Sequence, residues 1–247
     1  MMIVSMTILR HISAILALIV MVNGQDWRKM ADKTITTMDI QKAAANLAPH
    51  SAEMDSLYGS LFGSSPAGEY ITNIIGKESH YGMPTSGYHE DNTYSMSLSQ
   101  VDAIKYQDLL NDYNAILYNE ETKKHHRSGR YHKVNKINEY MQSQPGYEDW
   151  DMTKLATIKD GKYTGFSKHA KDPRTAYMLT RMLLMKDKGA IPVSLDEQAN
   201  AWDKMWNRNP EAGFPHEFIK IYQDYRANPV DDTMNSYNQV KKALPGR

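Results

Sequence analysis

Residues 175–187, with the sequence TAYMLTRMLLMKD, carry the clearest helical pattern in this chain. Apolar side chains are frequent there, and neither glycine nor proline interrupts the segment. These side chains are Tyr177, Met178, Met182, Leu183 and Leu184. The pattern predicts a helix over residues 175–187 that ends before the breaking pair Ile191-Pro192.

Similar patterns continue in both directions from this segment, while alternating strand patterns are scarce. Ser194 followed by Glu197 is a capping box that predicts the start of a further helix. Helices are expected over residues 27–50, 51–62, 67–77, 100–117, 151–158, 194–207 and 215–226. Loops are expected over residues 63–66, 82–94 and 161–173, with a short β-hairpin near 88–98. The sequence therefore predicts a mainly α-helical protein.

The composition excludes several functional classes. The chain has 247 residues, which suggests one domain with appendages, since a domain takes roughly 150 residues. Its 29 basic and 29 acidic residues balance, which argues against a nucleic-acid partner held by bulk charge. It has no cysteine, so disulfide scaffolds, thiol catalysis and cysteine zinc sites are excluded. No glycine-rich phosphate motif is present, and no cofactor is predicted.

The N-terminal 24 residues have the form of a secretory signal peptide. Arg10 and His11 precede an apolar run from Ile12 to Val22, and Gly24 provides a small residue for cleavage before Gln25. The run is too short to cross a bilayer alone. Residues 1–24 are thus expected to be a signal peptide or membrane anchor, with a packed N-terminal helix as the alternative.

A basic segment occupies residues 123–136. It contains three histidines, His125, His126 and His132, but no acidic or cysteine partner is spaced to complete a zinc site, so no metal is predicted. The segment is either a solvated loop or a surface that contacts nucleic acid, anionic lipid or an acidic cell-wall polymer.

Two short segments carry the chemistry. Residues 74–82, IIGKESHYG, place Glu78 at the C-terminal end of an apolar helix, followed at once by Ser79. Residues 94–100, YSMSLSQ, follow after a loop and end at Gln100. A carboxylate at a helix C-terminus is electrostatically unfavourable, which favours a functional role for Glu78 over an ordinary surface position.

This pair of segments resembles the lysozyme-like lytic transglycosylases. That family has a Glu-Ser dipeptide ending a helix and then a Gly-Leu-Met-Gln-like segment, where this chain has Ser97-Leu98-Ser99-Gln100. The glutamine is kept, while the glycine and the methionine are not. Residues 175–184 resemble the family's Tyr-Leu helix, and Trp206-Asn207 with the following Asn209-Pro210 resembles its Tyr-Asn-Ala-Gly-Pro segment. A long insertion over about residues 119–173 is not typical of the family.

The resemblance implies a lysozyme-like catalytic domain over residues 25–226, followed by a polar tail over 227–247. Glu78 would be the single catalytic acid and base that cleaves the MurNAc–GlcNAc β-1,4 bond of peptidoglycan. The residues expected at the substrate site are Ser79, Gln100, Tyr177, Trp206 and Asn207. Other roles stay open for them: a polar helix end for Ser79, a helix N-terminus for Gln100, and core packing for Tyr177, Trp206 and Asn207.

The expected pKa of Glu78 agrees with a role as catalytic acid. A free glutamate with a pKa of about 4.3 is mostly ionised near neutral pH, and desolvation beside an apolar helix would raise that pKa toward ~6. A hydrolytic lysozyme would need a second acid, for which Glu90, Asp91 and Asp102 are candidates.

The expected settings are an exported bacterial wall-remodelling enzyme in the cell envelope and a phage virion component that contacts other virion proteins. The alternative function is a non-catalytic structural or membrane-channel protein of a virion that keeps the fold.

Overall fold

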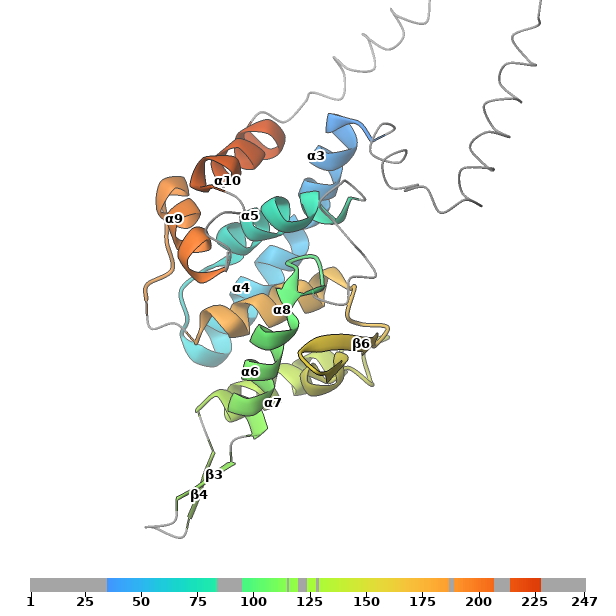
Figure 1. The fold of residues 1–247 in the computed structure, drawn as a ribbon, viewed down its shortest axis with the longest axis vertical. Coiled ribbons are helices and arrows are strands. Elements are labelled where there is room, and N and C mark those ends of the chain that lie inside the picture. Colours follow the sequence, from blue (N-terminus) through green and yellow to red (C-terminus); the bar gives the residue numbers. More distant parts are fainter. Residues whose placement is uncertain are drawn as a thin grey trace, which may run out of the picture.

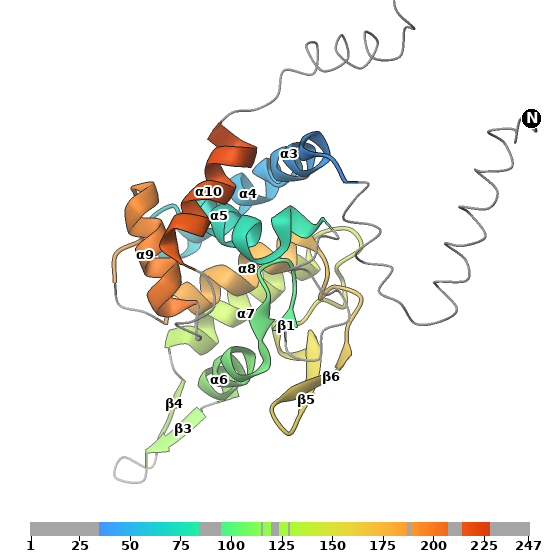
Figure 2. The ribbon, with the colours of Figure 1, turned by 45° about the horizontal axis from the view of Figure 1, so that its top comes forward.

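The computed structural model describes residues 35–83, 95–114, 116–119, 124–127, 129–186, 189–206 and 214–227. Helix α8, Pro173–Leu184, runs through the middle of the molecule (Figures 1 and 2). Asp172 caps its first turn by accepting from the backbone N–H of Arg174, and Pro173 occupies the position where no N–H is needed. Every residue from 175 to 184 is buried, so the expected helix is present and is surrounded on all sides at the centre of the core.

Three helices lie to one side of α8, and the second and third of them contact it. Helix α3, Thr37–Asn46, starts at a capping box between Thr36 and Asp39, and α4, Ala48–Phe62, follows directly. Gly63 ends α4 with a φ of 59°, a left-handed conformation that favours glycine. Helix α5, Gly68–Ser79, is capped from α4, because the Asp55 carboxylate accepts from the backbone N–H groups of Ala67 and Gly68. Both α4 and α5 contact α8.

Two C-terminal helices cover the outer side of α5 (Figures 1 and 2). Helix α9, Leu195–Met205, begins at the predicted capping box of Ser194 and Glu197, which is therefore confirmed. Helix α10, Pro215–Tyr222, contacts both α9 and α5 and continues as a π-helical turn over Gln223–Ala227. The C-terminal end of α5 consequently lies beside α9 and α10.

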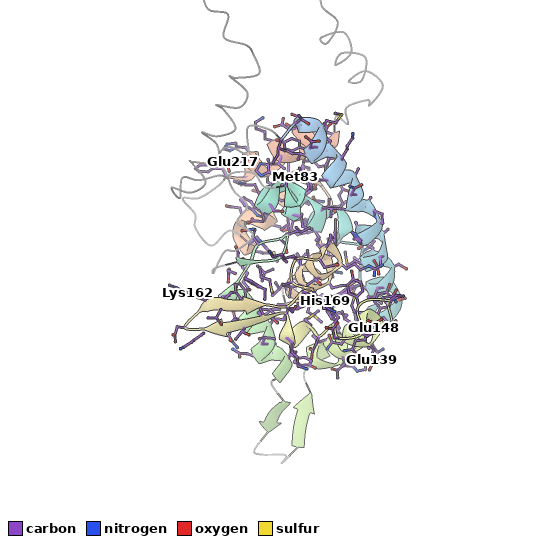
Figure 3. All side chains as sticks on the ribbon, turned by 90° about the vertical axis from the view of Figure 1, so that its right-hand side faces the viewer. Met83, Glu139, Glu148, Lys162, His169 and Glu217 are labelled. Carbon is purple, nitrogen blue, oxygen red and sulfur yellow. The ribbon has the colours of Figure 1, made fainter. Side chains whose placement is uncertain are left out.

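The other side of α8 holds α6, Ala103–Asn114, and α7, Gly129–Gln142, which contact each other. Three antiparallel strand pairs accompany them among the described residues. Strand β1, Ser95–Met96, pairs with β2, Val101–Asp102; β3, Ile116–Asn119, pairs with β4, Lys124–Arg127; and β5, Ala156–Lys159, pairs with β6, Lys162–Phe166. Lys162 lies at the outer end of the β5–β6 hairpin, which projects from the body (Figure 3).

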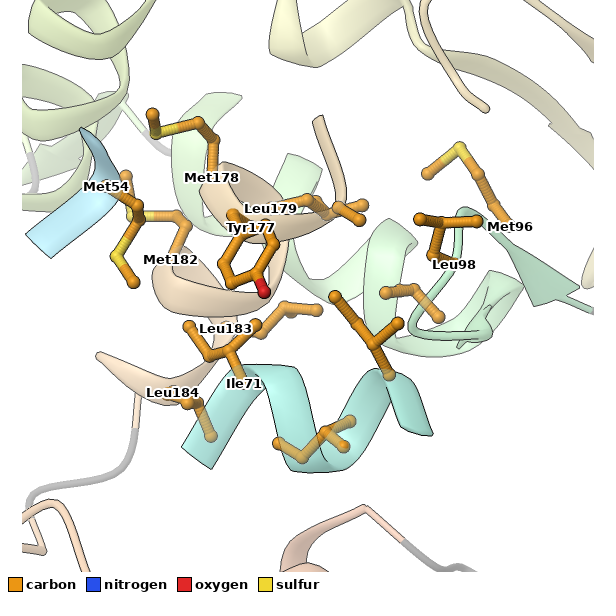
Figure 4. Close-up of a cluster of buried hydrophobic side chains, with 14 of the residues drawn as sticks. Met54, Ile71, Met96, Leu98, Tyr177, Met178, Leu179, Met182, Leu183 and Leu184 are labelled. Atoms are coloured by element: carbon orange, nitrogen blue, oxygen red, sulfur yellow. The ribbon is translucent and has the colours of Figure 1, made fainter. Parts of the chain in front are cut away.

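The core is one continuous cluster of buried apolar side chains around α8. Figure 4 shows α8 contributing Tyr177, Met178, Leu179, Met182, Leu183 and Leu184, with Met54 from α4 and Ile71 from α5 facing them. Met96 and Leu98 join this cluster from the β1–β2 hairpin. The expected mainly α-helical class is confirmed by this arrangement.

Several expected element boundaries are wrong. Residues 151–158 form a 3-10 turn, Met152–Lys154, followed by β5 rather than a helix, and the expected loop over 161–173 contains β6. Residues 100–102 belong to the turn and second strand of the β1–β2 hairpin, so the helix expected over 100–117 starts only at Ala103. The hairpin expected near 88–98 lies mostly outside the described residues, and its described end belongs to a hairpin with strands at residues 95–96 and 101–102.

Some predictions fall outside the described residues. These are the N-terminal segment 1–24, most of the loop expected over 82–94 and the C-terminal tail beyond residue 227, together with the side chains of residues 123–131 in the basic segment. Within the described part of the chain, no helix is both long enough and apolar enough to cross a membrane.

Candidate active site

Glu78 is half-buried in the last turn of α5, where α9 packs against that helix. The indole Nε1–H of Trp202, on α9, donates a hydrogen bond of 2.7 Å to Oε1 of Glu78. No hydrogen bond or ion pair engages Oε2 within the described part of the chain. The two oxygens of the carboxyl group therefore differ, since Oε1 is anchored by α9 and Oε2 is not.

The surroundings of Glu78 raise its pKa above the ordinary value of 4.5. Burial is the largest cause, because it disfavours the charged form. The Trp202 hydrogen bond and the positive charges of Lys105 and Lys77 act in the opposite direction and offset part of the effect. A carboxyl group with a raised pKa holds its proton closer to neutral pH, as a general acid requires.

The ring of Trp202 is in contact with side chains of α10 and α5. Its side chain is 3% exposed and its ring lies 5.8 Å from that of Phe218, on α10. The ammonium group of Lys77 lies 5.3 Å from the centre of the indole ring, within the range of a cation–π contact. Lys77 also pairs with Glu217 of α10 at 2.9 Å, so α5, α9 and α10 meet around this indole.

Ser79 is the last residue of α5, and its hydroxyl makes no hydrogen bond to the Glu78 carboxyl group. Its hydroxyl donates to the carbonyl of Ile75 and accepts from the backbone N–H of Gly82, both at 3.0 Å. The side chain is fully buried. The structure thus places Ser79 as a cap of the helix end, which is the alternative role that the sequence left open.

The backbone directly after Ser79 is strained. His80 and Tyr81 have φ values of 48° and 61°, in the left-handed region that residues with a side chain rarely adopt. This turn folds the Tyr81 ring back onto Gly76, where an added Cβ would lie 2.5 Å from Cζ of the ring. Strain of this kind persists where the surrounding structure holds it, and it often marks functional sites.

The second motif segment forms the turn of the β1–β2 hairpin and reaches the end of α5. A Cβ on Gly82 would lie 2.8 Å from Cδ2 of Leu98, so the two segments are in close contact. Gln100 is partly exposed, and its side-chain oxygen accepts from the Ser95 hydroxyl at 2.8 Å. Its amide nitrogen makes no hydrogen bond within the described residues.

Trp206 lies one helical turn after Trp202 and fixes the hairpin turn. Its Nε1–H donates to the carbonyl of Ser99 at 3.0 Å, while the Ser99 hydroxyl accepts from Thr180 of α8 at 2.6 Å. Lys105 lies over the Trp206 ring at 4.5 Å and donates to its carbonyl at 2.6 Å. A cavity of about 410 Å³ borders Trp206 and Lys105.

Two other predicted site residues remain, of which the structure describes only Tyr177. Tyr177 is fully buried, and its hydroxyl lies 2.5 Å from that of Thr72, on α5 (Figure 4). Of the two roles left open for Tyr177, the structure shows core packing, because the ring has no exposed surface to offer a ligand. Asn207 lies outside the described residues.

Among the candidate second acids, only Asp102 is described. Its carboxylate accepts from the backbone N–H of Lys105 at 2.7 Å and pairs with the Lys105 ammonium at 3.4 Å, which caps the start of α6. Glu90 and Asp91 lie outside the described residues. Of the candidate second acids, the one that the structure describes thus has both carboxylate oxygens engaged by Lys105.

Sequence reasoning missed Trp202 and Lys77. The signal that was present is the four-residue spacing of Trp202 and Trp206, which puts both on one face of α9. In the described part of the chain, no group of three or more His, Asp or Glu residues is arranged to hold a metal ion. Comparisons with protein-family models, curated proteins and solved structures found no match.

Proposed function

We propose that this chain is a lytic transglycosylase that cleaves the MurNAc–GlcNAc β-1,4 bond of peptidoglycan with Glu78 as its single acid and base. The observation that carries the proposal is the state of the Glu78 carboxyl group. Its Oε1 is held by Trp202, its Oε2 is unengaged within the described residues, and its pKa is raised by burial. These are the properties that proton donation to a glycosidic oxygen requires.

The proposed reaction proceeds in two steps without a water molecule. Protonated Glu78 donates its proton to the glycosidic oxygen as the bond from that oxygen to C1 of MurNAc breaks. The resulting carboxylate then takes the proton of the C6 hydroxyl of the same sugar, and that oxygen bonds to C1. Glu78 is regenerated in its protonated form, and the products are a GlcNAc end and a 1,6-anhydro-MurNAc end.

The backbone of the hairpin turn supports the resemblance to the transglycosylase family. Ser97 has a φ of 66°, in the left-handed region that favours glycine. Ser97 stands where that family has the glycine of its Gly-Leu-Met-Gln segment. The position therefore has the conformation for which a glycine would be suited, although this chain has serine there.

Two further residues, Gln100 of the second motif segment and Trp206 at the end of α9, are proposed to bind the glycan. The Gln100 amide nitrogen is a donor suited to the carbonyl of an N-acetyl group, because its partner oxygen is already held by Ser95. Trp206 borders the cavity next to Lys105 but is only 6% exposed, so its proposed role is to shape the wall of that cavity. Both assignments depend on the proposed role of Glu78.

The expected place of action follows from the substrate. Peptidoglycan lies outside the cytoplasmic membrane, so we propose that the N-terminal segment directs the chain to the cell envelope, or that the chain acts from a phage virion. A non-catalytic virion protein with the same fold is the alternative if the chain leaves peptidoglycan intact.

Product analysis tests the proposal directly. Purified protein is incubated with peptidoglycan sacculi, and the released muropeptides are weighed by mass spectrometry. We expect 1,6-anhydro-muropeptides, which are lighter by one water than the hydrolysis products. Release of reducing-end products alone would show a hydrolase instead, and the absence of any release would favour the structural alternative.

A further inference from the structure

We propose that Trp202 is the positioning residue of Glu78: its indole N–H fixes Oε1, so that Oε2 is the atom that carries and delivers the proton. This inference rests on the proposed function of Glu78. It assigns a role in the reaction to a residue of α9 that the motif segments do not include. The hydrogen bond of 2.7 Å from Nε1 to Oε1 is its starting point.

The Trp202 indole is packed on several sides, as a residue that positions another side chain must be. Trp202 is almost completely buried, with Phe218 against its ring and the Lys77 ammonium 5.3 Å from the ring centre. Glu217 holds Lys77 in turn at 2.9 Å. These contacts come from α5 and α10, so the indole of α9 is held by side chains of two further helices.

This arrangement makes the two carboxyl oxygens inequivalent. An N–H donor pointed at Oε1 disfavours a proton on that oxygen, since two hydrogens would then face each other. The proton of the neutral form is therefore expected on Oε2, which has no partner among the described residues. After proton transfer, the same N–H stabilises the carboxylate that has to act as the base.

The charged groups around Glu78 set the direction of the expected pH effect. Lys77 from α5 and Lys105 from α6 favour the ionised form, and Glu217 from α10 faces Lys77 rather than Glu78. The Trp202 hydrogen bond lowers the pKa of Glu78 against the larger effect of burial. Removing the indole N–H should therefore raise this pKa further.

Trp202→Phe is the variant that isolates the N–H, because it keeps an aromatic ring under Lys77 and against Phe218. In assays on solubilised glycan strands, we expect kcat to fall by about 10- to 100-fold, the range for loss of a hydrogen bond to a charged group, with little change in KM. The alkaline limb of the pH–rate profile should move to higher pH, because the acid keeps its proton longer.

Trp150→Phe is the matched control. Trp150 is also fully buried, and its indole N–H donates to the Thr175 hydroxyl at 2.9 Å, so the control loses a buried indole hydrogen bond at a different place. It should leave the pH–rate profile unchanged. Circular dichroism confirms that each variant is folded before it is assayed.

A direct titration of Glu78 separates failure of this inference from failure of the proposed function. The protein is labelled with 13C at glutamate carboxyl groups, and the Glu78 signal is assigned from its loss in Glu78→Gln. An upward shift of its pKa in Trp202→Phe but not in Trp150→Phe, with a parent that cleaves peptidoglycan, supports the positioning role; the same shift in an inactive parent means that the proposed function has failed while the indole N–H still acts on Glu78. An unchanged Glu78 titration would overturn the positioning role.

A second change protects the test against a folding defect in Trp202→Phe. Incorporation of β-(3-benzothienyl)alanine at position 202 replaces the indole N–H by sulfur and keeps the shape of the ring system. The same upward pKa shift and loss of kcat are expected. Parent-like values for both quantities in a folded protein would contradict the role of the N–H.

Discussion

At the scale of single residues, the raised pKa of the Glu78 carboxyl group affects both the stability of the fold and the proposed reaction. Burial at the end of α5 makes its charge unfavourable, and the Trp202 N–H with two lysine ammonium groups offsets only part of that effect. The folded state therefore holds a proton on Glu78 at pH values where the unfolded chain has lost it. A group that is costly to the fold in this way is a common sign of a functional site.

The sign of this pKa shift gives a stability prediction for Glu78→Gln. The pKa in the folded state lies above the ordinary value of 4.5, so the penalty is absent well below pH 4.5 and develops as the pH rises through the folded-state pKa. Glutamine does not ionise, and its side-chain oxygen still accepts from Trp202. The variant should therefore unfold with a larger free energy than the parent at neutral pH and with a similar one in acid.

Urea denaturation of both proteins at neutral pH and at an acidic pH where both are folded measures this difference. The exposed Glu69, also on α5, supplies the control variant Glu69→Gln, which should show no such pH-dependent gain. A Glu78→Gln protein that is less stable than its parent at neutral pH would show that the ionised carboxylate is favoured in the fold.

At the scale of elements, the sequence predicts the helices well and the hairpins poorly. The apolar content of α8, the capping box of α9 and the breaker after α4 are local signals, and each is confirmed. The β5–β6 hairpin was missed although Asp160-Gly161 is a strong two-residue turn signal. Its strands alternate only over four or five residues, with exposed polar side chains that also suit a loop.

This hairpin turn yields a prediction about Gly161. Asp160 and Gly161 have φ values of 51° and 72°, so the turn requires the left-handed conformation at both positions. Gly161→Ala should lower the free energy of unfolding by about 1 kcal/mol, because alanine is disfavoured in that conformation. No atom lies within 4 Å of the added Cβ, so the effect is conformational and not steric.

Gly165, in β6, is the matched control for Gly161. It also has open space around an added Cβ, but its φ is not positive. Gly165→Ala should therefore leave the unfolding free energy within about 0.5 kcal/mol of the parent, as for most substitutions of this kind. Equal losses in the two variants, measured by urea denaturation, would mean that the turn conformation does not cause the effect.

The sequence predicts only those site residues that belong to short local motifs. The position of Glu78 at a helix end and the turn that ends at Gln100 follow from two short segments. The contact between Trp202 and Glu78 joins residues 124 positions apart, so it depends on how α9 packs against α5. Local patterns carry no information about such packing, which also explains why the burial of Tyr177 was left open.

At the scale of the whole molecule, α9 joins the two motif segments. Trp202 reaches Glu78 at the end of α5, and Trp206, one turn later, reaches Ser99 in the β1–β2 turn. Thr180 of the central helix holds the same serine from the other side. The core thus brings the Glu-Ser segment and the Gln segment into contact, as a shared catalytic role would require.

The activity of Glu78→Gln on peptidoglycan sacculi, followed as clearing of turbidity, is the measurement that bears most directly on the proposed function. Loss of a general acid typically lowers the rate by ~10²–10⁴-fold, so clearing by the folded variant should fall below detection while Glu69→Gln clears like the parent. If purified Glu78→Gln, folded by circular dichroism, clears sacculi within about threefold of an active parent, a loss far below that range, Glu78 is not the catalytic acid.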